Sequence, residues 1–424
     1  MMPGTNSVAR TRTGTHVRFR VLRMAFVLAI ITYLDRVCIS IAAPSIIADL
    51  GLTMLEMGTA FSAFTLAYSL FEIPSGWLGD RIGARRVLAR IVLWWSVFTM
   101  LTGTVRGIGS LVAVRFLFGA GEAGAFPNLA RSFATWFPPI ERGRATGILF
   151  FGTRIGGALA APAVLLLITR WGWRASFAVF GVLGFLWTAW WLRSYRDRPE
   201  EDPDVDAAEL SWISAGRQTG PSPPTPWRSL LTSPNLAAIC AMYFGYAYGL
   251  YFYFTWLPTY LVQGLGFSQA GTGFFASLPF VLAGLANLAG GWTTDRLSRS
   301  HGLRHARVTL GSVSFATSGA LILASTFGSD PIVKAVLLAA ALGAADFALS
   351  ACWAVCLDIG AAHAGVVTAF MNTVGNIGGF IGPIVVGYMV DRWQSWTMPL
   401  YLTAGVYVLG ALAWLTIDPN RRIA

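Results

Sequence analysis

Charged residues are scarce in this chain. Only 12% of its 424 residues are Asp, Glu, Lys or Arg, and lysine occurs once, at Lys334. Soluble globular domains carry about 25% charged residues. Hydrophobic residues make up 55% of the chain, and the mean hydropathy is +0.59. So few charges cannot cover a soluble surface of ordinary composition, and we therefore expect an all-α integral membrane protein in a lipid bilayer.

Cysteine and histidine are scarce as well, with four residues of each. All four cysteines lie in apolar segments, where packed free thiols are expected: Cys38, Cys240, Cys352 and Cys356. No histidine is placed to complete a metal site with them. The sequence contains no recognisable nucleophile, metal cluster or cofactor motif. We therefore expect neither an enzyme nor a resident cofactor or metal.

Apolar stretches long enough to cross a bilayer follow one another along the chain. We predict twelve spanning helices, at residues 21–44, 55–76, 84–105, 107–133, 143–169, 174–193, 234–262, 270–292, 305–327, 332–357, 364–390 and 396–417. The one sizeable polar insertion covers residues 194–232 and is rich in acids and then in proline. The chain should thus form a six-helix bundle over residues 1–193, a cytoplasmic linker over 194–232 and a second six-helix bundle over 233–424.

The basic residues are distributed unevenly among the predicted loops. The formal net charge is +11, which in a soluble protein would raise the question of nucleic acid. Threaded with the N-terminus inside, 23 basic residues fall on the cytoplasmic side and five outside. This bias predicts cytoplasmic termini. The basic excess is therefore explained by membrane topology, and we expect no nucleic-acid partner.

The two predicted bundles are related by an internal duplication. Residues 76–81, Gly-Trp-Leu-Gly-Asp-Arg, recur as residues 291–296, Gly-Trp-Thr-Thr-Asp-Arg. A second pair at nearly the same spacing aligns residues 154–157, Arg-Ile-Gly-Gly, with 376–379, Asn-Ile-Gly-Gly. Duplicated apolar chains of this kind are typical of secondary transporters, whose substrate site lies between the repeats.

Six ionisable residues lie deep in the predicted spans: Asp35, Arg36, Arg115, Glu122, Arg154 and Asp346. Each costs roughly 2.5–3.5 kcal/mol in the hydrocarbon region, so such residues are functional candidates by default. Three acids offset three arginines. Protonation of one acid leaves the site net positive, and this provides a physical basis for moving a proton and an anion together. The alternative is that these charges only brace the bundle through ion pairs.

Amides and aromatics complete the candidate substrate site. Arg154 and Asn376 occupy equivalent positions in the two repeats, and Asn372 lies one turn before Asn376. A guanidinium opposite two amides can bind a carboxylate and neighbouring hydroxyls. Tyr251 belongs to a cluster of aromatics in span 234–262 that would line the site. The alternatives are that the asparagines satisfy helix backbones and that the aromatics are packing residues.

The repeated Gly-Trp-x-x-Asp-Arg segments lie at predicted cytoplasmic helix ends. There Asp80 and Asp295 can accept hydrogen bonds from a neighbouring helix, while Arg81 and Arg296 face the interface. We interpret these four residues as support or gating residues rather than as an active site.

These segments resemble the major facilitator superfamily, and further motifs resemble its anion:cation symporter family. The resemblance covers essentially the whole chain and rests on residues 33–36 with 40–44, Arg115 with 121–123, 136–138 with 141–143, and 372–379. It implies a fold of two pseudo-symmetric six-helix bundles, and a monomer in the bacterial inner membrane.

The resemblance also implies roles for individual residues. Arg36 is similar to the family's substrate-binding arginine, and Asp35 and Glu122 are similar to its proton-coupling carboxylates. Substrate contacts are implied for Tyr68, Ser350, Trp353 and Asn372. Arg154 and Asp346 depart from the sugar-acid members, and a second cation favours a more anionic or a larger substrate unless Asp346 neutralises it.

We therefore predict a proton-coupled symporter that imports an organic anion, with sugar acids of the galactonate, hexuronate or glucarate type as the leading class. The proton gradient would supply the energy. The alternatives are an exporter or antiporter of another organic anion and a transporter-like sensor. The resemblance implies that spans 143–169 and 332–357 face each other across the two halves, and their helix depths are similar at Arg154 and Asp346. We therefore expect a bond between these two residues, although each can instead be satisfied within its own half.

Overall fold

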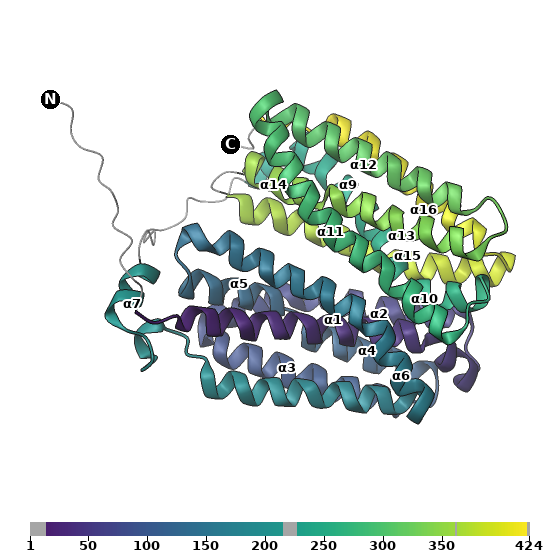
Figure 1. Cartoon of the computed structure of the whole chain (residues 1–424), viewed down its shortest axis with the longest axis horizontal. Helices are drawn as coiled ribbons and strands as arrows, with labels where there is room; N and C mark the ends of the chain where they lie inside the picture. Colours follow the sequence, from purple (N-terminus) through teal and green to yellow (C-terminus); the bar gives the residue numbers. More distant parts are fainter. Residues whose placement is uncertain (1–13, 215–226, 361–362, 422–424) are drawn as a thin grey trace.

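The computed structural model describes residues 14–214, 227–360 and 363–421, without the side chains of Asp80, Pro139, Ile140 and Gln269. Within these ranges every secondary-structure element is a helix. The helices form two bundles that lie side by side, and the described part of the chain begins and ends at the same end of the molecule (Figure 1). We call this the terminal end, and the other the opposite end.

The first bundle, the N half, contains six helices: α1 (Val17–Leu50), α2 (Met54–Ile82), α3 (Ala84–Thr102), α4 (Ile108–Glu122), α5 (Ala125–Trp136) and α6 (Pro139–Ser194). The backbone of α6 leaves helical geometry at Gly172, where φ is 77°. This helix therefore contains two predicted spans, one on each side of the glycine. The segment between the halves carries η1 (Pro199–Glu201), α7 (Ala207–Ser214) and α8 (Trp227–Leu231).

The second bundle, the C half, follows the same plan. Its elements are α9 (Pro234–Thr255), α10 (Leu257–Thr259), η2 (Tyr260–Gly264), α11 (Gln269–His301), α12 (Leu303–Ser325), α13 (Pro331–Phe347), α14 (Leu349–Gly360), α15 (Ala364–Trp393) and α16 (Thr397–Thr416). Several helices run beyond the predicted spans, because their polar ends extend past the apolar stretch that defined each prediction.

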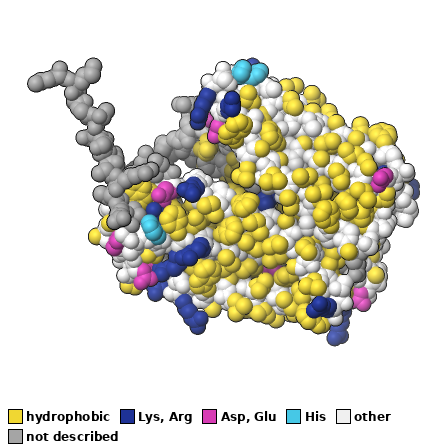
Figure 2. Space-filling model, viewed as in Figure 1, with side chains coloured by type: hydrophobic (Ala, Val, Ile, Leu, Met, Phe, Trp, Pro, Cys, Tyr) yellow, Lys and Arg dark blue, Asp and Glu magenta, His cyan; other side chains and the backbone are white. Residues whose placement is uncertain are grey.

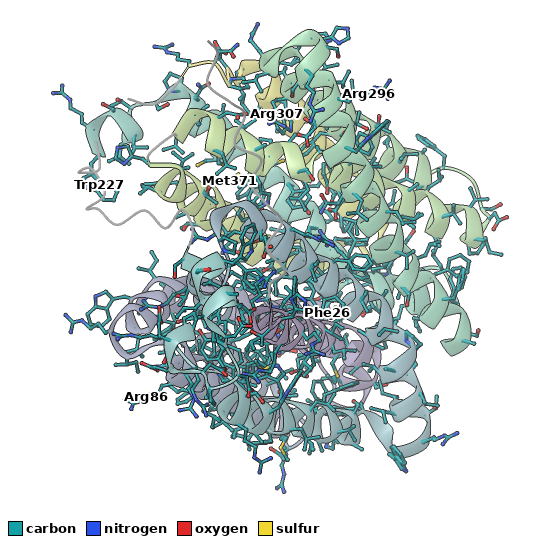
Figure 3. The ribbon with its side chains drawn as sticks, turned by 60° about the vertical axis from the view of Figure 1, so that its left-hand side comes forward. Phe26, Arg86, Trp227, Arg296, Arg307 and Met371 are labelled. Carbon is teal, nitrogen blue, oxygen red and sulfur yellow. The ribbon has the colours of Figure 1, made fainter. Side chains whose placement is uncertain are left out.

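Nine helical stretches in the described part of the chain are long and apolar enough to cross a membrane. One of the nine is divided at Gly172. Counting this stretch twice and adding α2 and α3 gives the twelve predicted spans. Most charged side chains on the visible face lie near its two ends, and hydrophobic side chains cover much of the area between them (Figure 2). Arg86 on one bundle and Arg296 and Arg307 on the other lie at the end that is brought forward in Figure 3.

The predicted span at residues 107–133 proves to be two helices. Gly124 separates α4 from α5 with a φ of 87°, a conformation that favours glycine. A Cβ atom at this glycine would lie 2.3 Å from Cβ of Ser75 on α2. The tight approach therefore also requires glycine here. The break ends α4 at Glu122, so this carboxylate lies at a helix terminus.

The two halves are joined closely at the opposite end. The Asp391 carboxylate on α15 accepts hydrogen bonds from the first two N–H groups of α2, at Met54 (3.1 Å) and Leu55 (2.7 Å). Gly58 allows α2 to approach so closely that a Cβ atom there would lie 2.4 Å from the Pro383 carbonyl oxygen. The Ser277 hydroxyl on α11 donates to the Ala158 carbonyl on α6 at 2.7 Å. These contacts close the opposite end.

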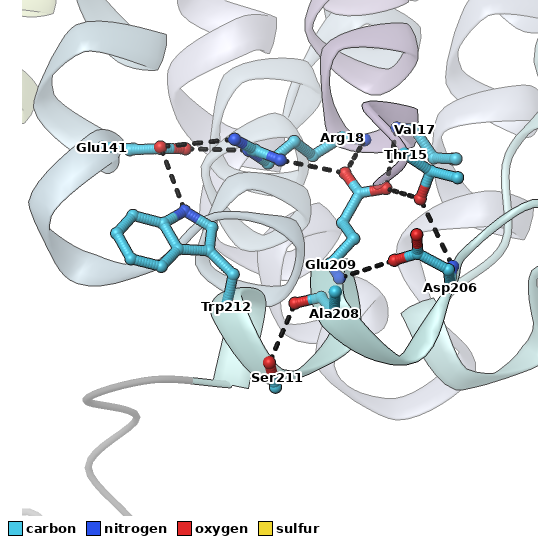
Figure 4. Close-up of polar contacts among 9 residues, drawn as sticks. All are labelled: Thr15, Val17, Arg18, Glu141, Asp206, Ala208, Glu209, Ser211 and Trp212. Carbon is cyan, nitrogen blue, oxygen red and sulfur yellow. Dashed lines mark hydrogen bonds and ion pairs between the residues drawn. The ribbon is translucent and has the colours of Figure 1, made fainter. Parts of the chain in front are cut away.

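At the terminal end, the segment after α6 docks on the N half. Glu209 of α7 is fully buried and accepts hydrogen bonds from the Thr15 hydroxyl and from the backbone N–H groups of Val17 and Arg18, which begin α1 (Figure 4). The Arg18 guanidinium bridges Glu209 and Glu141 at 3.1 and 2.9 Å. Glu209 thus caps α1 from a distant part of the sequence.

We expect Glu209→Ala to destabilise the N half by about 2 kcal/mol, because two backbone donors and part of the Arg18 charge lose their partner. Burial raises the pKa of the Glu209 carboxyl, but the hydrogen bonds from Thr15, the two backbone N–H groups and Arg18 outweigh it and lower the pKa overall. A lowered folded-state pKa means that this stabilisation is present above the ordinary glutamate pKa and is lost as pH falls through the folded-state value.

Thermal unfolding of the purified protein should therefore show a difference between wild type and Glu209→Ala at neutral pH that shrinks in acid. The matched control is Glu201→Ala, whose carboxylate pairs with Arg198 on the exposed surface, and which should change stability by less than about 0.5 kcal/mol. Equal effects of the two substitutions at neutral pH would contradict the capping role of Glu209.

Candidate functional site

Arg36 and Glu122 form an ion pair in the interior of the N half. The Arg36 Nε atom donates to Oε1 of Glu122 at 2.5 Å. The Glu122 side chain is 1% exposed, whereas that of Arg36 is 16% exposed. Neither Nη2 of Arg36 nor Oε2 of Glu122 has a hydrogen-bond partner among the described residues. The arginine therefore retains an unpartnered donor, Nη2, which is buried within the site.

Aromatic rings surround the Arg36 guanidinium. Its carbon lies 4.8 Å from the ring centre of Tyr68, 5.2 Å from Phe64, 5.3 Å from Tyr33 and 6.0 Å from Phe126. Rings from α1, α2 and α5 thus hold a planar cation, which stacks on such faces better than an ammonium does. The structure brings Tyr68 and Arg36 together, as expected for two residues of one site.

Asp35 lies buried beside Arg36 on α1, and neither of its carboxylate oxygens has a hydrogen-bond partner in the described part of the chain. Its electrostatic neighbours are Glu122, Arg115 and the indole of Trp95. Arg115 is itself buried, with its guanidinium 5.0 and 4.6 Å from the ring centres of Phe64 and Phe118. Asp35 and Glu122 therefore form a coupled pair of acids flanked by two arginines.

Close helix packing makes this arrangement possible. A Cβ atom at Gly119 would lie 2.3 Å from the Phe64 carbonyl oxygen on α2, and one at Gly121 would lie 1.8 Å from the Trp94 ring on α3. The small residues around Glu122 thus permit close helix approach.

The other ion pair of the site joins the two halves. Nη2 of Arg154 on α6 lies 2.5 Å from Oδ2 of Asp346 on α13. The Tyr246 hydroxyl on α9 donates to the other oxygen of Asp346 at 2.7 Å. Asp346 is fully buried, whereas the Arg154 side chain is 12% exposed. The expected bond between Arg154 and Asp346 is confirmed, with Tyr246 as an additional partner.

A further polar contact between the halves involves Glu72, which the sequence analysis did not identify. The Asn372 amide on α15 donates to the Glu72 carboxylate on α2 at 3.5 Å, and Glu72 also interacts electrostatically with Arg36. The nearby Asn376 amide nitrogen is buried without a partner among the described residues. A lone acid between Phe71 and Ile73 within a predicted span was the available signal.

The remaining predicted substrate residues lie on the C-half side. Tyr251 interacts electrostatically with Arg36. The Trp353 ring lies 6.1 Å from that of Phe150, so it reaches across to α6. The Ser350 hydroxyl donates to the side-chain oxygen of Asn287 on α11 at 2.6 Å. Their contact with substrate remains a prediction.

The two repeated motifs have equivalent arrangements. The guanidinium of Arg81 lies 4.1 Å from the Trp77 ring centre, and that of Arg296 lies 5.3 Å from the Trp292 ring centre. Both arginines and Asp295 are exposed. Asp80 lies outside the described side chains, so its predicted role stays a prediction.

An ion pair that the sequence analysis missed lies next to the second motif. Arg307 pairs with Asp358 at 3.2 Å and donates to the Thr294 hydroxyl at 3.0 Å. Arg307 thereby connects the helices around the second motif. The gating roles of Arg81, Asp295 and Arg296 remain predictions.

Other parts of the described chain offer no metal cluster. No group of three His, Cys, Asp or Glu side chains that could hold a metal occurs within the described residues. All four cysteines are free thiols, as expected, and Cys38, Cys352 and Cys356 are buried. A pocket of about 570 Å³ near the terminal end is lined by N-half and linker residues, among them Arg81, Tyr195 and Asp197.

Comparisons with known proteins bear directly on this geometry. Residues 25–383 match the model of the family described as Major Facilitator Superfamily. The chain belongs to the Major Facilitator Superfamily. It is therefore a multi-pass membrane protein. A solved bacterial homologue of the human lysosomal transporter Spinster, inward-facing and unoccupied, shares this superfamily fold with a TM-score of 0.79 at 17% identity, covering 96% of this chain and 99% of that one.

Relatives within the superfamily match over nearly the full length. A probable sulfoacetate transporter of Cupriavidus necator is 35% identical over 95% of this chain and 94% of its own. A probable galactarate/D-glucarate transporter of Bacillus subtilis is 32% identical, covering 98% and 95%. The D-galactonate transporter of Escherichia coli is 31% identical, covering 94% and 95%.

The ion pair between the halves can be tested with a double-mutant cycle. Arg154→Gln and Asp346→Asn should each reduce stability and transport, because each leaves a buried charge without its partner. The double variant should be less impaired than the sum of the two, with a coupling free energy of about 1–3 kcal/mol in thermal unfolding. Independent, additive losses would show that the two residues do not interact.

Proposed function

We propose that the chain is a proton-coupled symporter that imports a small organic anion by alternating access, with its termini in the cytoplasm of a bacterial cell. Sugar acids and related small carboxylates are the proposed substrates. The observation that carries this proposal is the state of Arg36. Its side chain is partly exposed, its buried Nη2 has no hydrogen-bond partner among the described residues, and it is held by a buried carboxylate that a substrate carboxylate can replace.

The relatives support the class of substrate. Their names describe transporters of sulfoacetate, galactarate or D-glucarate, hexuronate and D-galactonate. All of these are small organic anions, although some carry one acid group and others carry two. The names therefore support an anion site without deciding how many acid groups it receives.

Coupling to protons follows from competition for Arg36. When a substrate carboxylate takes the place of Glu122 on the guanidinium, Glu122 is left as a buried carboxylate without its partner. An unpaired buried charge is costly. A proton on Glu122 or on the adjacent Asp35 removes that cost, so protonation and anion binding favour each other. This linkage is the physical requirement for symport.

Alternating access follows from where the halves touch. At the opposite end, the outer side in the proposed orientation, the halves are joined through α2 with α15 and α6 with α11. Deeper polar links between the halves are Arg154 with Asp346 and Glu72 with Asn372. Each deeper link uses a group close to the anion site, so substrate and protons can change the relative stability of the two orientations.

Uptake by the purified protein in liposomes tests the function. Labelled galactonate, glucuronate, glucarate and sulfoacetate are supplied outside, with and without a pH gradient that is acid outside. We expect at least one of them to accumulate only with the gradient, and a protonophore should abolish the accumulation. Absence of uptake for the whole panel contradicts the proposal. Equilibrating uptake that is insensitive to the gradient contradicts proton coupling.

A further inference from the structure

Arg154 and Arg36 are the two arginines of the cluster whose side chains remain partly accessible, at 12% and 16%, while their partners Asp346 and Glu122 are 0% and 1% exposed. In each pair the carboxylate is buried and the arginine side chain is the more exposed partner. Arg115, by contrast, is buried, with its guanidinium between two phenylalanine rings. The two accessible arginines therefore present two separate positive groups.

Tyr33 is a neighbour of both arginines. The Arg36 guanidinium lies 5.3 Å from the Tyr33 ring centre, and both arginines interact electrostatically with Tyr33. A Cβ atom at Gly156, two residues after Arg154, would lie 3.0 Å from Cβ of Tyr33, so α6 and α1 pack closely here. Both arginines thus lie near one aromatic side chain, which places them around the same part of the site.

Arg154 has donor capacity beyond its ion pair. A guanidinium carries five N–H donors in a planar fork, and the contact with Asp346 is made through Nη2. Gly284 of α11 packs against the aliphatic stem of Arg154, where a Cβ atom added to the glycine would lie 3.4 Å from Cβ of Arg154. Asp346 keeps the Tyr246 hydroxyl as a second partner, so its carboxylate retains one hydrogen bond if Arg154 turns to another anion.

We propose that Arg154 is a second anion subsite and that the substrate is a small molecule with two acid groups, one bound by Arg36 and the other by Arg154 in competition with Asp346. The chemical class is a short dicarboxylate, or a carboxylate that also carries a sulfonate. This inference rests on the proposed function, which requires only one acid group. The second group adds charge-assisted hydrogen bonds, which corresponds to about 10- to 100-fold in affinity.

The test compares matched pairs of ligands that differ by one acid group. Glucarate and gluconate form one pair, and sulfoacetate and isethionate form the other. Dissociation constants are measured on the purified full-length protein near neutral pH, where the acid groups of all four compounds are ionised. Wild type should bind the diacid of at least one pair about 10- to 100-fold more tightly than its monoacid partner.

Three variants assign the preference to Arg154. We compare the variants by the ratio of the monoacid dissociation constant to that of its diacid partner. In Arg154→Gln this ratio should fall to within about threefold of one. In Asp346→Asn the ratio should rise above that of wild type, because Arg154 loses its competitor while the hydrogen-bonding shape of the side chain is retained. The matched control is Arg170→Gln, an exposed arginine on the same helix, which should keep the wild-type ratio.

Two results would overturn the subsite. One is a wild type that prefers neither diacid, and the other is an Arg154→Gln variant that keeps the preference. Because Arg154→Gln leaves Asp346 without its ion-pair partner, the double variant Arg154→Gln/Asp346→Asn provides a folded comparison and should also lack the preference. Gradient-driven uptake of monoacids alone would refute this subsite while leaving the proposed symport intact. Absence of any anion uptake would refute the symport itself.

Discussion

Asp35→Asn should bring the accumulation ratio of the substrate in liposomes from about ten to about one under a gradient of one pH unit. With one proton moved per substrate, a tenfold proton ratio supports a tenfold substrate ratio. The variant removes the acid that would carry the proton but keeps the size of the side chain. Exchange of labelled for unlabelled substrate requires no net proton movement, so counterflow should persist.

The reason lies in the surroundings of Asp35. It is buried, its oxygens lack hydrogen-bond partners in the described part of the chain, and its charged neighbours are Glu122 and Arg115. Its ionised form is therefore sensitive to any change of charge on Glu122. That change occurs when substrate takes Arg36. Glu122→Gln should likewise abolish accumulation, and it additionally frees Arg36 from its ion pair.

Asp49→Asn is the matched control for this experiment. Asp49 lies on the same helix, but at the opposite end, where it pairs with Arg174 on the surface. Exposed ion pairs contribute little, so the control should accumulate substrate like wild type. If Asp35→Asn and Glu122→Gln also accumulate substrate normally, neither carboxylate couples protons to transport.

Much of the fold follows from the sequence, because membrane helices are identified by length and polarity. The duplication around residues 76–81 and 291–296 indicated two bundles, and both repeats lie at equivalent helix ends. The break at Gly124 was missed because α4 and α5 form one apolar stretch. Only the close approach of Ser75 shows why the helix must stop there.

The charged part of the site was also largely predictable, since buried charges stand out in apolar segments. What the sequence could not show is which charges pair. Arg115 and Glu122 share a helix face, yet the ion pair is made by Arg36. Tyr246 and Glu72 acquire their roles through contacts made 100 and 300 residues away in the chain, with Asp346 and Asn372. Such contacts depend on packing between helices rather than on local pattern.

The contact between the linker and the N half was also not predictable from local sequence pattern. The acids between residues 197 and 209 identified a polar linker, but burial of Glu209 against the start of α1 depends on a tertiary contact 191 residues away. A dense run of acids is usually a solvated surface, and the pattern alone cannot distinguish one buried acid within it.

Arg36 should be the side chain whose loss most weakens substrate binding. Arg36→Lys keeps the charge but loses the planar fork that can bind a carboxylate through two hydrogen bonds while lying against aromatic rings. We expect about 10- to 100-fold weaker binding for the lysine variant and more than about 100-fold for Arg36→Ala, because each charge-assisted hydrogen bond contributes about 1.5–3 kcal/mol. Equilibrium binding to the purified protein measures both.

Two further variants separate recognition from folding. Arg36→Ala leaves Glu122 buried without a partner, so Arg36→Ala/Glu122→Gln restores neutrality and should still fail to bind. Arg106→Lys, the same change at an exposed loop position as Arg36→Lys, should bind like wild type. The four rings within 6.0 Å of the Arg36 guanidinium favour a flat cation over a compact one. Binding by Arg36→Lys as tight as that of wild type would therefore show that this aromatic enclosure does not serve carboxylate recognition.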